Sequence, residues 1–546
     1  MSLKPFLAAA VLGLSATLAA CGNGASEDDV PTLRRGISAK VDTLDPHRSS
    51  AAWENVVIGD MIVGLMQTGP NGEVIPGVAE SWELDDSNLV WTFKLREDVV
   101  WSDGVPLTAN DFVYALRRIQ DPALAAQYSS LLYIIKNAEA VNNGELPGEE
   151  MGVRALDDNT LEITLKEPAP YLLEMLTHYT TYPVPQHIVE QYGEDWVDPD
   201  NIEVNGPYKL MFWQTGNQIV ADKNPLFWEA DEVCFDRVVY LELEDPTAVE
   251  RRIEAGEMDI NNSFDGTRKT ELMERFPGWP RTSPSLLTTY YSFNGTQEPF
   301  NDVRVRNALA MALDREFMVE NVLTPGFIPA YSFVPPNIGN YDTERPEVSW
   351  KDLSREDRLV RAKELLEEAG FGPDSPLQFE FIFRSTGDNP KAAPVAQSNW
   401  NDIADWVDAQ ILRQDTKVLY ARLRQNDFEV ADGGWIADYS DPNNFLYLLD
   451  SRTGQQNYGD YNNSEYDALL RQASNETDLA RRAEIFAEAE AIMLEDAAIS
   501  PMWFGVNVNM VDPEITGWGE NAKDIHRSRW MCRTDLEAAL AEAEGE

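Results

Sequence analysis

The chain has 546 residues, of which 43% are hydrophobic and 10% aromatic, so it can bury a large core divided among two or three domains. Its 93 acidic residues outnumber 44 basic ones and give a formal net charge of −49. Because like charges repel, this balance excludes nucleic acids and anionic membrane surfaces as principal partners, and it fits an acidic surface in an extracytoplasmic or salty medium.

The first thirty residues carry signals for export. The apolar run at residues 6–20 is too short to span a bilayer comfortably, so residues 1–20 are predicted to be a secretory signal peptide. Residues 18–22 read Leu-Ala-Ala-Cys-Gly, which resembles a bacterial lipobox and implies a lipidated Cys21; the alternative is an ordinary cleavage site that holds a cysteine. Residues 21–30 are small and polar, as in a flexible tether. No later run approaches ~18 apolar residues, so no transmembrane helix is expected.

The first half of the mature chain alternates short strands and helices. Thr108 is placed to cap a helix, with Asp111 at the third position of a near capping box. The residue pattern predicts strands at 33–37, 78–96 (a hairpin) and 156–165, and helical spacing predicts a helix at 55–66. A further helix is expected at 186–192, after the Pro-Val-Pro segment.

The second half follows the same pattern. The sequence predicts strands at 289–294 and 377–383, and a terminal strand region from 502 toward 530. It also predicts helices after Asn301 or Asp302, at 355–369 with Gly370 as the stop signal, and at 478–494. Arg304 and Arg306 are expected to be solvated or in structural ion pairs.

Two cysteines remain beyond Cys21, namely Cys234 and Cys532. In an oxidising compartment two unpaired thiols are unusual, so we hypothesise one disulfide between them. Two buried free thiols are the alternative.

One stretch, residues 428–446, has an unusual composition. Phe428 and Val430 alternate with polar neighbours, as in a half-buried strand, and two glycines then precede Trp435. Trp435 and Tyr439 bracket the carboxylate of Asp438 in what we expect to be a strand-end loop, and an Asp-Pro-Asn turn follows. A carboxylate between aromatic rings suits a small cationic ligand. The alternative is a packed strand-to-turn corner with a surface aspartate.

Residues 433–446 resemble the G-W-x-A-D-Y-x-[DE]-P-x-x-F-L signature of the oligopeptide/dipeptide-binding family (solute-binding protein family 5) of ABC-transporter substrate-binding proteins. Segments 43–47, 78–113, 205–228 and 289–315 are also similar to that family. The resemblance implies an α/β, two-lobed periplasmic-binding-protein-like fold of class II, large, with mixed β-sheets flanked by helices and three structural domains. Their expected limits are 31–68, 203–285 and 505–546 for domain I, 69–202 for an inserted domain II, and 286–504 for domain III, the second lobe.

The same resemblance implies a ligand site. Asp438 would hold the α-amino group of a peptide, while Trp435, Tyr439 and Tyr128 would line side-chain pockets. Gly434 would allow close approach of the ligand. Asn262 is a candidate partner for a peptide backbone, or else part of an ordinary polar loop.

The anchor for the carboxyl end of the ligand stays unassigned. Some close peptide binders carry an arginine shortly before the Gly-Trp pair, but here Asp432 and Gly433 stand there. Arg422 and Arg424 are candidates, with a solvated surface as the alternative.

The implied role is the binding component of an ABC importer, monomeric and tethered in the periplasm by its lipid anchor alone. Its partners would be a peptide ligand and the permease and ATPase complex of the inner membrane, with no cofactor or metal. Other ligands of such proteins are dipeptides, nickel chelates, haem, opines and sugars. The four histidines form no His-Glu-x-x-His motif, and no Gly-x-Ser-x-Gly or phosphate loop is present, so no enzyme is predicted. An exported hydrolase or an envelope chaperone remains the alternative of another class.

Overall fold

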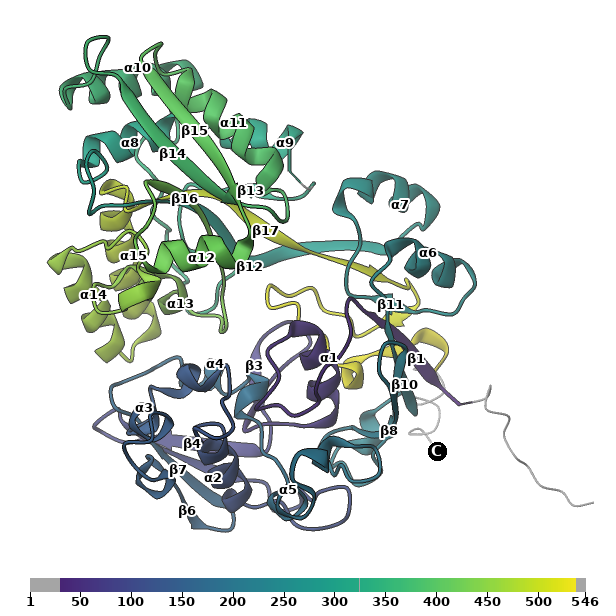
Figure 1. Cartoon of the computed structure of the whole chain (residues 1–546). Helices are drawn as coiled ribbons and strands as arrows, with labels where there is room; N and C mark the ends of the chain where they lie inside the picture. Colours follow the sequence, from purple (N-terminus) through teal and green to yellow (C-terminus); the bar gives the residue numbers. More distant parts are fainter. Residues whose placement is uncertain (1–29, 324, 537–546) are drawn as a thin grey trace, which may run out of the picture.

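The computed structural model describes residues 30–323 and 325–536. The largest sheet is mixed and has eleven strands (Figure 1). Ten of them follow the order β15-β14-β16-β12-β17-β11-β1-β10-β9-β8, and β13 pairs with β17. The strands are β1 (Thr32–Ile37), β8 (Tyr208–Gln214), β9 (Gln218–Lys223), β10 (Arg237–Glu242), β11 (Ile260–Asn261), β12 (Pro280–Phe293), β13 (Ile328–Pro329), β14 (Leu377–Arg384), β15 (Val407–Gln414), β16 (Val430–Ile436) and β17 (Ile499–Val511).

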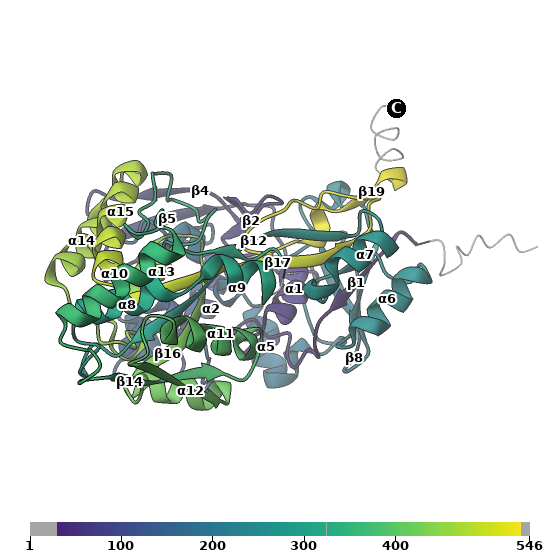
Figure 2. The same ribbon diagram turned by 90° about the horizontal axis from the view of Figure 1, so that it is seen from above.

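Two long antiparallel strands connect the halves of this sheet. β12 and β17 pair from Pro280–Met510 to Ser292–Ile499 and lie side by side in both ribbon views (Figures 1 and 2). Separate apolar cores form at their two ends, one built mainly from residues 33–260 and 511–531 and the other from residues 286–503. We call the parts lobe 1 (residues 30–280 and 511–536) and lobe 2 (residues 286–503). The chain therefore has the two-lobed α/β architecture that the resemblance implied, whereas the exact domain limits stay a prediction.

Lobe 1 contains a second, four-stranded antiparallel sheet in the order β4-β5-β7-β6. Its strands are β4 (Ala79–Leu84), β5 (Val90–Leu95), β6 (Val153–Asp157) and β7 (Thr160–Thr164), and a small hairpin joins β2 (Met66–Thr68) to β3 (Val74–Pro76). The helices of lobe 1 are α1 (Ala52–Met61), α2 (Ala109–Arg118), α3 (Ala138–Asn142), α4 (Leu172–Met175), α5 (Gln186–Tyr192), α6 (Pro246–Glu254) and α7 (Lys269–Arg275). The predicted capping box of α2 is confirmed, since the Asp111 carboxylate accepts from the Thr108 amide at 2.8 Å.

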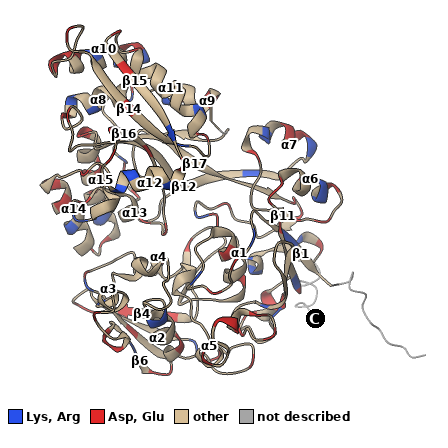
Figure 3. Ribbon diagram, viewed as in Figure 1, with Lys and Arg blue, Asp and Glu red and all other residues tan. Residues whose placement is uncertain are grey.

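Lobe 2 covers its strands with helices on both faces. These are α8 (Val303–Ala312), α9 (Arg315–Asn321), α10 (Arg355–Glu368), α11 (Asn389–Asn401), α12 (Thr416–Arg424), α13 (Asn443–Leu446), α14 (Ser464–Asn475) and α15 (Leu479–Glu495). Asp302 caps α8 as predicted. Acidic residues occur over both lobes (Figure 3). Across residues 30–323 and 325–536, none of the helices has the length and apolar character needed to cross a membrane.

Most predicted elements are confirmed, but the helix expected at residues 55–66 had the wrong bounds. It begins at Ala52 and ends at Met61, because Ile62 takes an extended conformation. The side-chain amide of Asn205 then bonds both main-chain groups of Val63, at 3.0 and 2.9 Å, in place of helical partners. The terminal strand region was also too long: β17 ends at Val511, and only β18 (Ile515–Thr516) and β19 (Cys532–Arg533) follow.

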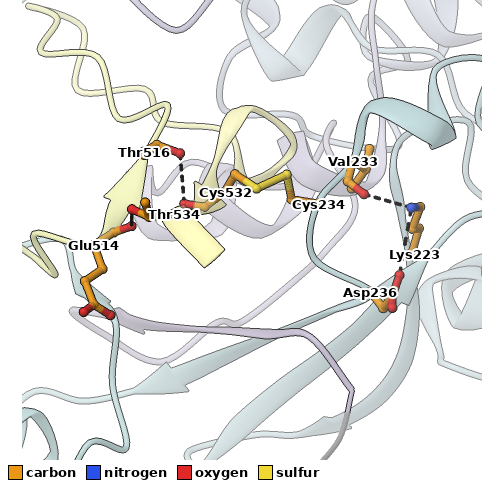
Figure 4. Close-up of a disulfide and its surroundings, with 8 residues drawn as sticks. All are labelled: Lys223, Val233, Cys234, Asp236, Glu514, Thr516, Cys532 and Thr534. Carbon is orange, nitrogen blue, oxygen red and sulfur yellow. Dashed lines mark hydrogen bonds and ion pairs between the residues drawn. A yellow bond between two sulfur atoms is a disulfide. The ribbon is translucent and has the colours of Figure 1, made fainter. Parts of the chain in front are cut away.

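The structure contains the disulfide that we hypothesised. Cys234 and Cys532 are bonded across 298 positions of the chain, which fastens the C-terminal segment beside the residues leading into β10 (Figure 4). Thr516 donates to the Cys532 carbonyl at 3.2 Å on the same β18-β19 ribbon. The signal peptide and Cys21 lie outside the described residues.

Candidate functional site

Strand β16 carries the distinctive motif into the middle of lobe 2. It pairs with β12 on one side, antiparallel, and with β14 on the other, parallel. A Cβ on Gly433 would lie 2.8 Å from the ring of Tyr290, and one on Gly434 would lie 3.1 Å from the guanidinium of Arg384. The two glycines therefore let neighbouring side chains approach the strand closely.

One detail of the expected strand-end loop was wrong, because Trp435 lies within β16 and not in the loop after it. Phe428 and Val430 are buried, as their alternation predicted. Ala431 and Asp432 are buried as well, because β16 is an inner strand that is covered on both faces.

The loop after β16 is fixed firmly to lobe 2. The side-chain oxygen of Asn444 accepts hydrogen bonds from the Trp435 indole at 2.7 Å and from the Asp438 amide at 3.3 Å. Asp441 is fully buried and receives both ends of the Arg482 guanidinium, at 2.7 and 2.9 Å. A bidentate pair of this kind is costly to break, because either partner alone would be a buried, uncompensated charge.

Two chambers lie between the lobes and meet at this loop. The first has a volume of about 1140 Å³ and the second about 480 Å³. Each is lined from both lobes, and four residues line both of them: Tyr128, Ile436, Asp438 and Tyr439. Volumes of this size suit a small ligand held at a junction of rigid parts.

Asp438 is a half-buried carboxylate at the junction of the chambers. No Lys, Arg or His side chain of the described chain forms an ion pair with it. Burial raises the pKa of Asp438 to about 6, because the charged form has lost part of its hydration without gaining a partner. A perturbed carboxylate in a cleft is a candidate binding group for a cation.

Aromatic side chains surround this carboxylate. Burial and the charge of Asp438 together raise the pKa values of Tyr128, Tyr179 and Tyr447. Trp435 packs edge-on to Tyr447, with ring centroids 6.2 Å apart. On the lobe 1 side, Tyr128 lies 5.2 Å from the ring of His178, whose pKa burial lowers to about 3, so that this histidine stays neutral.

The structure brings most of the predicted site residues together. Asp438, Trp435, Gly434, Tyr439 and Tyr128 all line the first chamber. Asn262 lines only the second chamber, where its side-chain oxygen has no hydrogen-bond partner within the described chain. The roles of these residues in binding stay a prediction.

Neither arginine considered for the carboxyl end is among the residues lining a chamber. Arg422 instead pairs with Asp427 at 3.0 Å and with Glu380 at 3.5 Å, and Arg424 lies at the end of α12. Their positions therefore favour the alternative, in which these arginines lie at the protein surface and not in the ligand site.

Sequence reasoning missed the cations that do line the first chamber. These are Lys166, Arg384, Arg452 and Arg471. Arg384 forms a bidentate pair with Asp432, at 2.7 and 3.0 Å, beneath Gly434. Burial alone would lower the pKa of Arg384, but the Asp432 carboxylate raises it. One signal was available: Arg384 ends the clearly alternating strand β14, and polar residues at strand ends often face ligands.

Comparison with known proteins agrees with this architecture. Residues 73–457, more than half of the chain, match the family of bacterial extracellular solute-binding proteins, family 5 Middle. The chain belongs to this family. The periplasmic oligopeptide-binding protein OppA of Salmonella typhimurium is 37% identical over 515 residues, which cover 94% of this chain and 94% of that protein. Members of family 5 are binding proteins and not enzymes, and the periplasmic relatives support a periplasmic protein.

Two solved structures resemble this chain closely. The unliganded open form of the periplasmic murein tripeptide-binding protein MppA has a TM-score of 0.83 at 33% identity, covering 92% of this chain and 98% of that one. OppA of Haemophilus influenzae in complex with RPPGFSPFR has a TM-score of 0.74 at 32% identity, covering 93% and 99%. Both structures cover more than nine-tenths of this chain, so the fold is shared along nearly its whole length.

Proposed function

We propose that this protein binds oligopeptides between its two lobes and delivers them to an ABC permease and ATPase complex in the inner membrane. Relatives named for oligopeptide binding and the solved complex of one of them with RPPGFSPFR support the ligand class. We further propose that the chain acts as a monomer, exported by residues 1–20 and tethered through a lipid on Cys21.

The observation that carries the proposal is the unpaired, half-buried carboxylate of Asp438 at the junction of the two chambers. The α-ammonium of a peptide would supply the missing positive charge, and the aromatic rings of Trp435 and Tyr128 would keep water away from the pair. As the lobes close, the ligand would be buried, so that binding shifts the population toward the closed form. Tyr439 would line the pocket, and Gly434 would let the ligand approach the strand closely. Asn262 would offer the ligand a polar contact in the second chamber.

The direct test uses tetra-alanine and its N-acetylated form in titration calorimetry. Tetra-alanine should bind and the acetylated peptide, which lacks the ammonium group, should bind far more weakly. Asp438→Ala should lower the affinity for tetra-alanine by about 2–5 kcal/mol, the usual cost of removing one partner of a buried charge pair.

Equal binding of both peptides, or unchanged affinity in Asp438→Ala, would contradict the assignment of Asp438. Native mass spectrometry of the protein as purified identifies a ligand carried from the cell. A dipeptide, opine, sugar or metal chelate found there would redirect the ligand class and leave the transport role standing. For the anchor, mass spectrometry of the N-terminal peptide should show a lipid on Cys21 that Cys21→Ser abolishes.

A further inference from the structure

The ligand-binding loop of lobe 2 is packed against lobe 1. Within the described chain, Tyr439 is the single lobe 2 residue in the apolar cluster of lobe 1, with 8% of its surface exposed. Its ring stacks on that of Tyr171, with centroids 5.0 Å apart and planes at 7°. Offset stacking at this distance is a favourable aromatic geometry.

Tyr171 contacts lobe 2 through a second group as well. The guanidinium of Arg482 lies 5.6 Å from the centre of the Tyr171 ring, and Arg482 is the buried partner of Asp441. One ring of lobe 1 thus touches both Tyr439, next to Asp438, and the cation that fixes the far end of the same loop.

The following helix, α4, extends this contact. Glu174 on α4 pairs with Lys523 of the C-terminal segment at 2.6 Å. Burial raises the pKa of Glu174, and the nearby main chain at Ser440 opposes that rise. Residues 439–441 are therefore approached from two sides, by lobe 2 through Asp441 and by lobe 1 through Tyr171 and Glu174.

We propose that Tyr171 of lobe 1 is a positioning residue for the binding loop of lobe 2: its ring, stacked on Tyr439, holds the neighbouring carboxylate of Asp438 at the junction of the two chambers. Without the stack, the loop keeps only the Glu174 part of its contact with lobe 1. Water then reaches Asp438 from lobe 1, and the carboxylate no longer stands partly dehydrated and preorganised for an ammonium group. The ligand site of one lobe is in this sense completed by the other.

The inference rests on the proposed function for its ligand measurement but has a test that needs no ligand. Carbon-13 NMR of the aspartate carboxyl groups, with the Asp438 signal assigned by its loss in Asp438→Asn, follows the titration of Asp438 directly. The groups facing it are Tyr128, Tyr179 and Tyr447, which stay neutral in the pH range used. Tyr171→Ala should lower the midpoint by about one pH unit, toward the value of a hydrated carboxyl.

Conservative and control variants separate positioning from general loosening. Tyr171→Phe retains the flat ring, so the midpoint of the Asp438 titration should stay that of the parent protein. Tyr133→Ala removes another half-buried tyrosine of the first chamber, one bonded to Asn142 at 2.8 Å, and should also leave the midpoint unchanged. In calorimetry, Tyr171→Ala should weaken tetra-alanine binding about two- to tenfold, with Tyr171→Phe near the parent.

An unchanged Asp438 midpoint in Tyr171→Ala overturns the inference, and so does an equal shift in Tyr133→Ala. Should Tyr171→Ala fail to fold, Tyr171→Leu keeps the bulk without a flat ring and is judged by the same shift. If tetra-alanine does not bind the parent protein, the proposed function is in error while the ligand-free titration still decides the role of Tyr171.

Discussion

Replacing Asp438 by asparagine should make the ligand-free protein more stable at neutral pH. The pKa of Asp438 is raised to about 6 from an ordinary value of 3.8, because burial disfavours its charged form. At ~1.4 kcal/mol per pKa unit, keeping this carboxylate ionised costs the folded state up to about 3 kcal/mol at pH 7.5. Asp438→Asn removes that cost with little change in shape.

The direction of the pH dependence follows from the proton balance. Between pH 3.8 and 6 the folded protein holds the Asp438 proton more firmly than the unfolded chain does. The contribution of this group to the free energy of unfolding therefore falls as pH rises through that window, and above pH 6 the full penalty is present. The difference between variant and parent should be near zero at pH 3.5 and largest above pH 6.

Urea denaturation of both proteins at a series of pH values measures this difference, since the titrations of the other carboxylates cancel in the subtraction. Glu73→Gln is a control at a lobe 1 carboxylate outside the two chambers, and it should raise the free energy of unfolding at pH 7.5 by less than Asp438→Asn does. If the parent and Asp438→Asn had equal free energies of unfolding at pH 7.5, Asp438 could not be an uncompensated buried charge.

Three further outcomes are expected. Affinity for tetra-alanine should fall below pH 6, by up to about tenfold per pH unit, as Asp438 becomes protonated; calorimetry between pH 7.5 and 4.5 checks this, and a flat profile would contradict it. Arg384→Met should destabilise lobe 2 by about 3–5 kcal/mol in urea, because Asp432 would be left buried and unpaired, and adding Asp432→Leu should restore much of the loss. Cys234→Ser with Cys532→Ser should lower stability by about 2–5 kcal/mol, and an unchanged denaturation curve would argue against the bond.

Local patterns in the sequence located most of the elements. The capping box at Thr108 and Asp111 fixed the start of α2, and the alternating residues 377–383 predicted β14, because hydrogen bonds between near neighbours and side-chain periodicity are local properties. The helix expected at residues 55–66 ends earlier, at Met61, because a distant side chain, Asn205, bonds the main chain of Val63.

The residues of the candidate site likewise fall into those that the sequence indicated and those that only the structure revealed. The motif around Asp438 is continuous in sequence, so composition alone made its carboxylate and aromatic residues visible. Arg384 was missed because it reaches the site only through the pairing of β14 with β16. Tyr171 was missed because its stack with Tyr439 joins residues that are 268 positions apart and belong to different lobes.

The sequence by itself predicted the export signals and the acid most suited to hold a cation, because each is written in a short run of residues, and its family motifs together predicted the class of fold. Only the tertiary structure decided that this acid stands without a cationic partner at the junction of two chambers. Burial and pairing depend on side chains brought together by folding, and no local pattern encodes which charges end up neutralised.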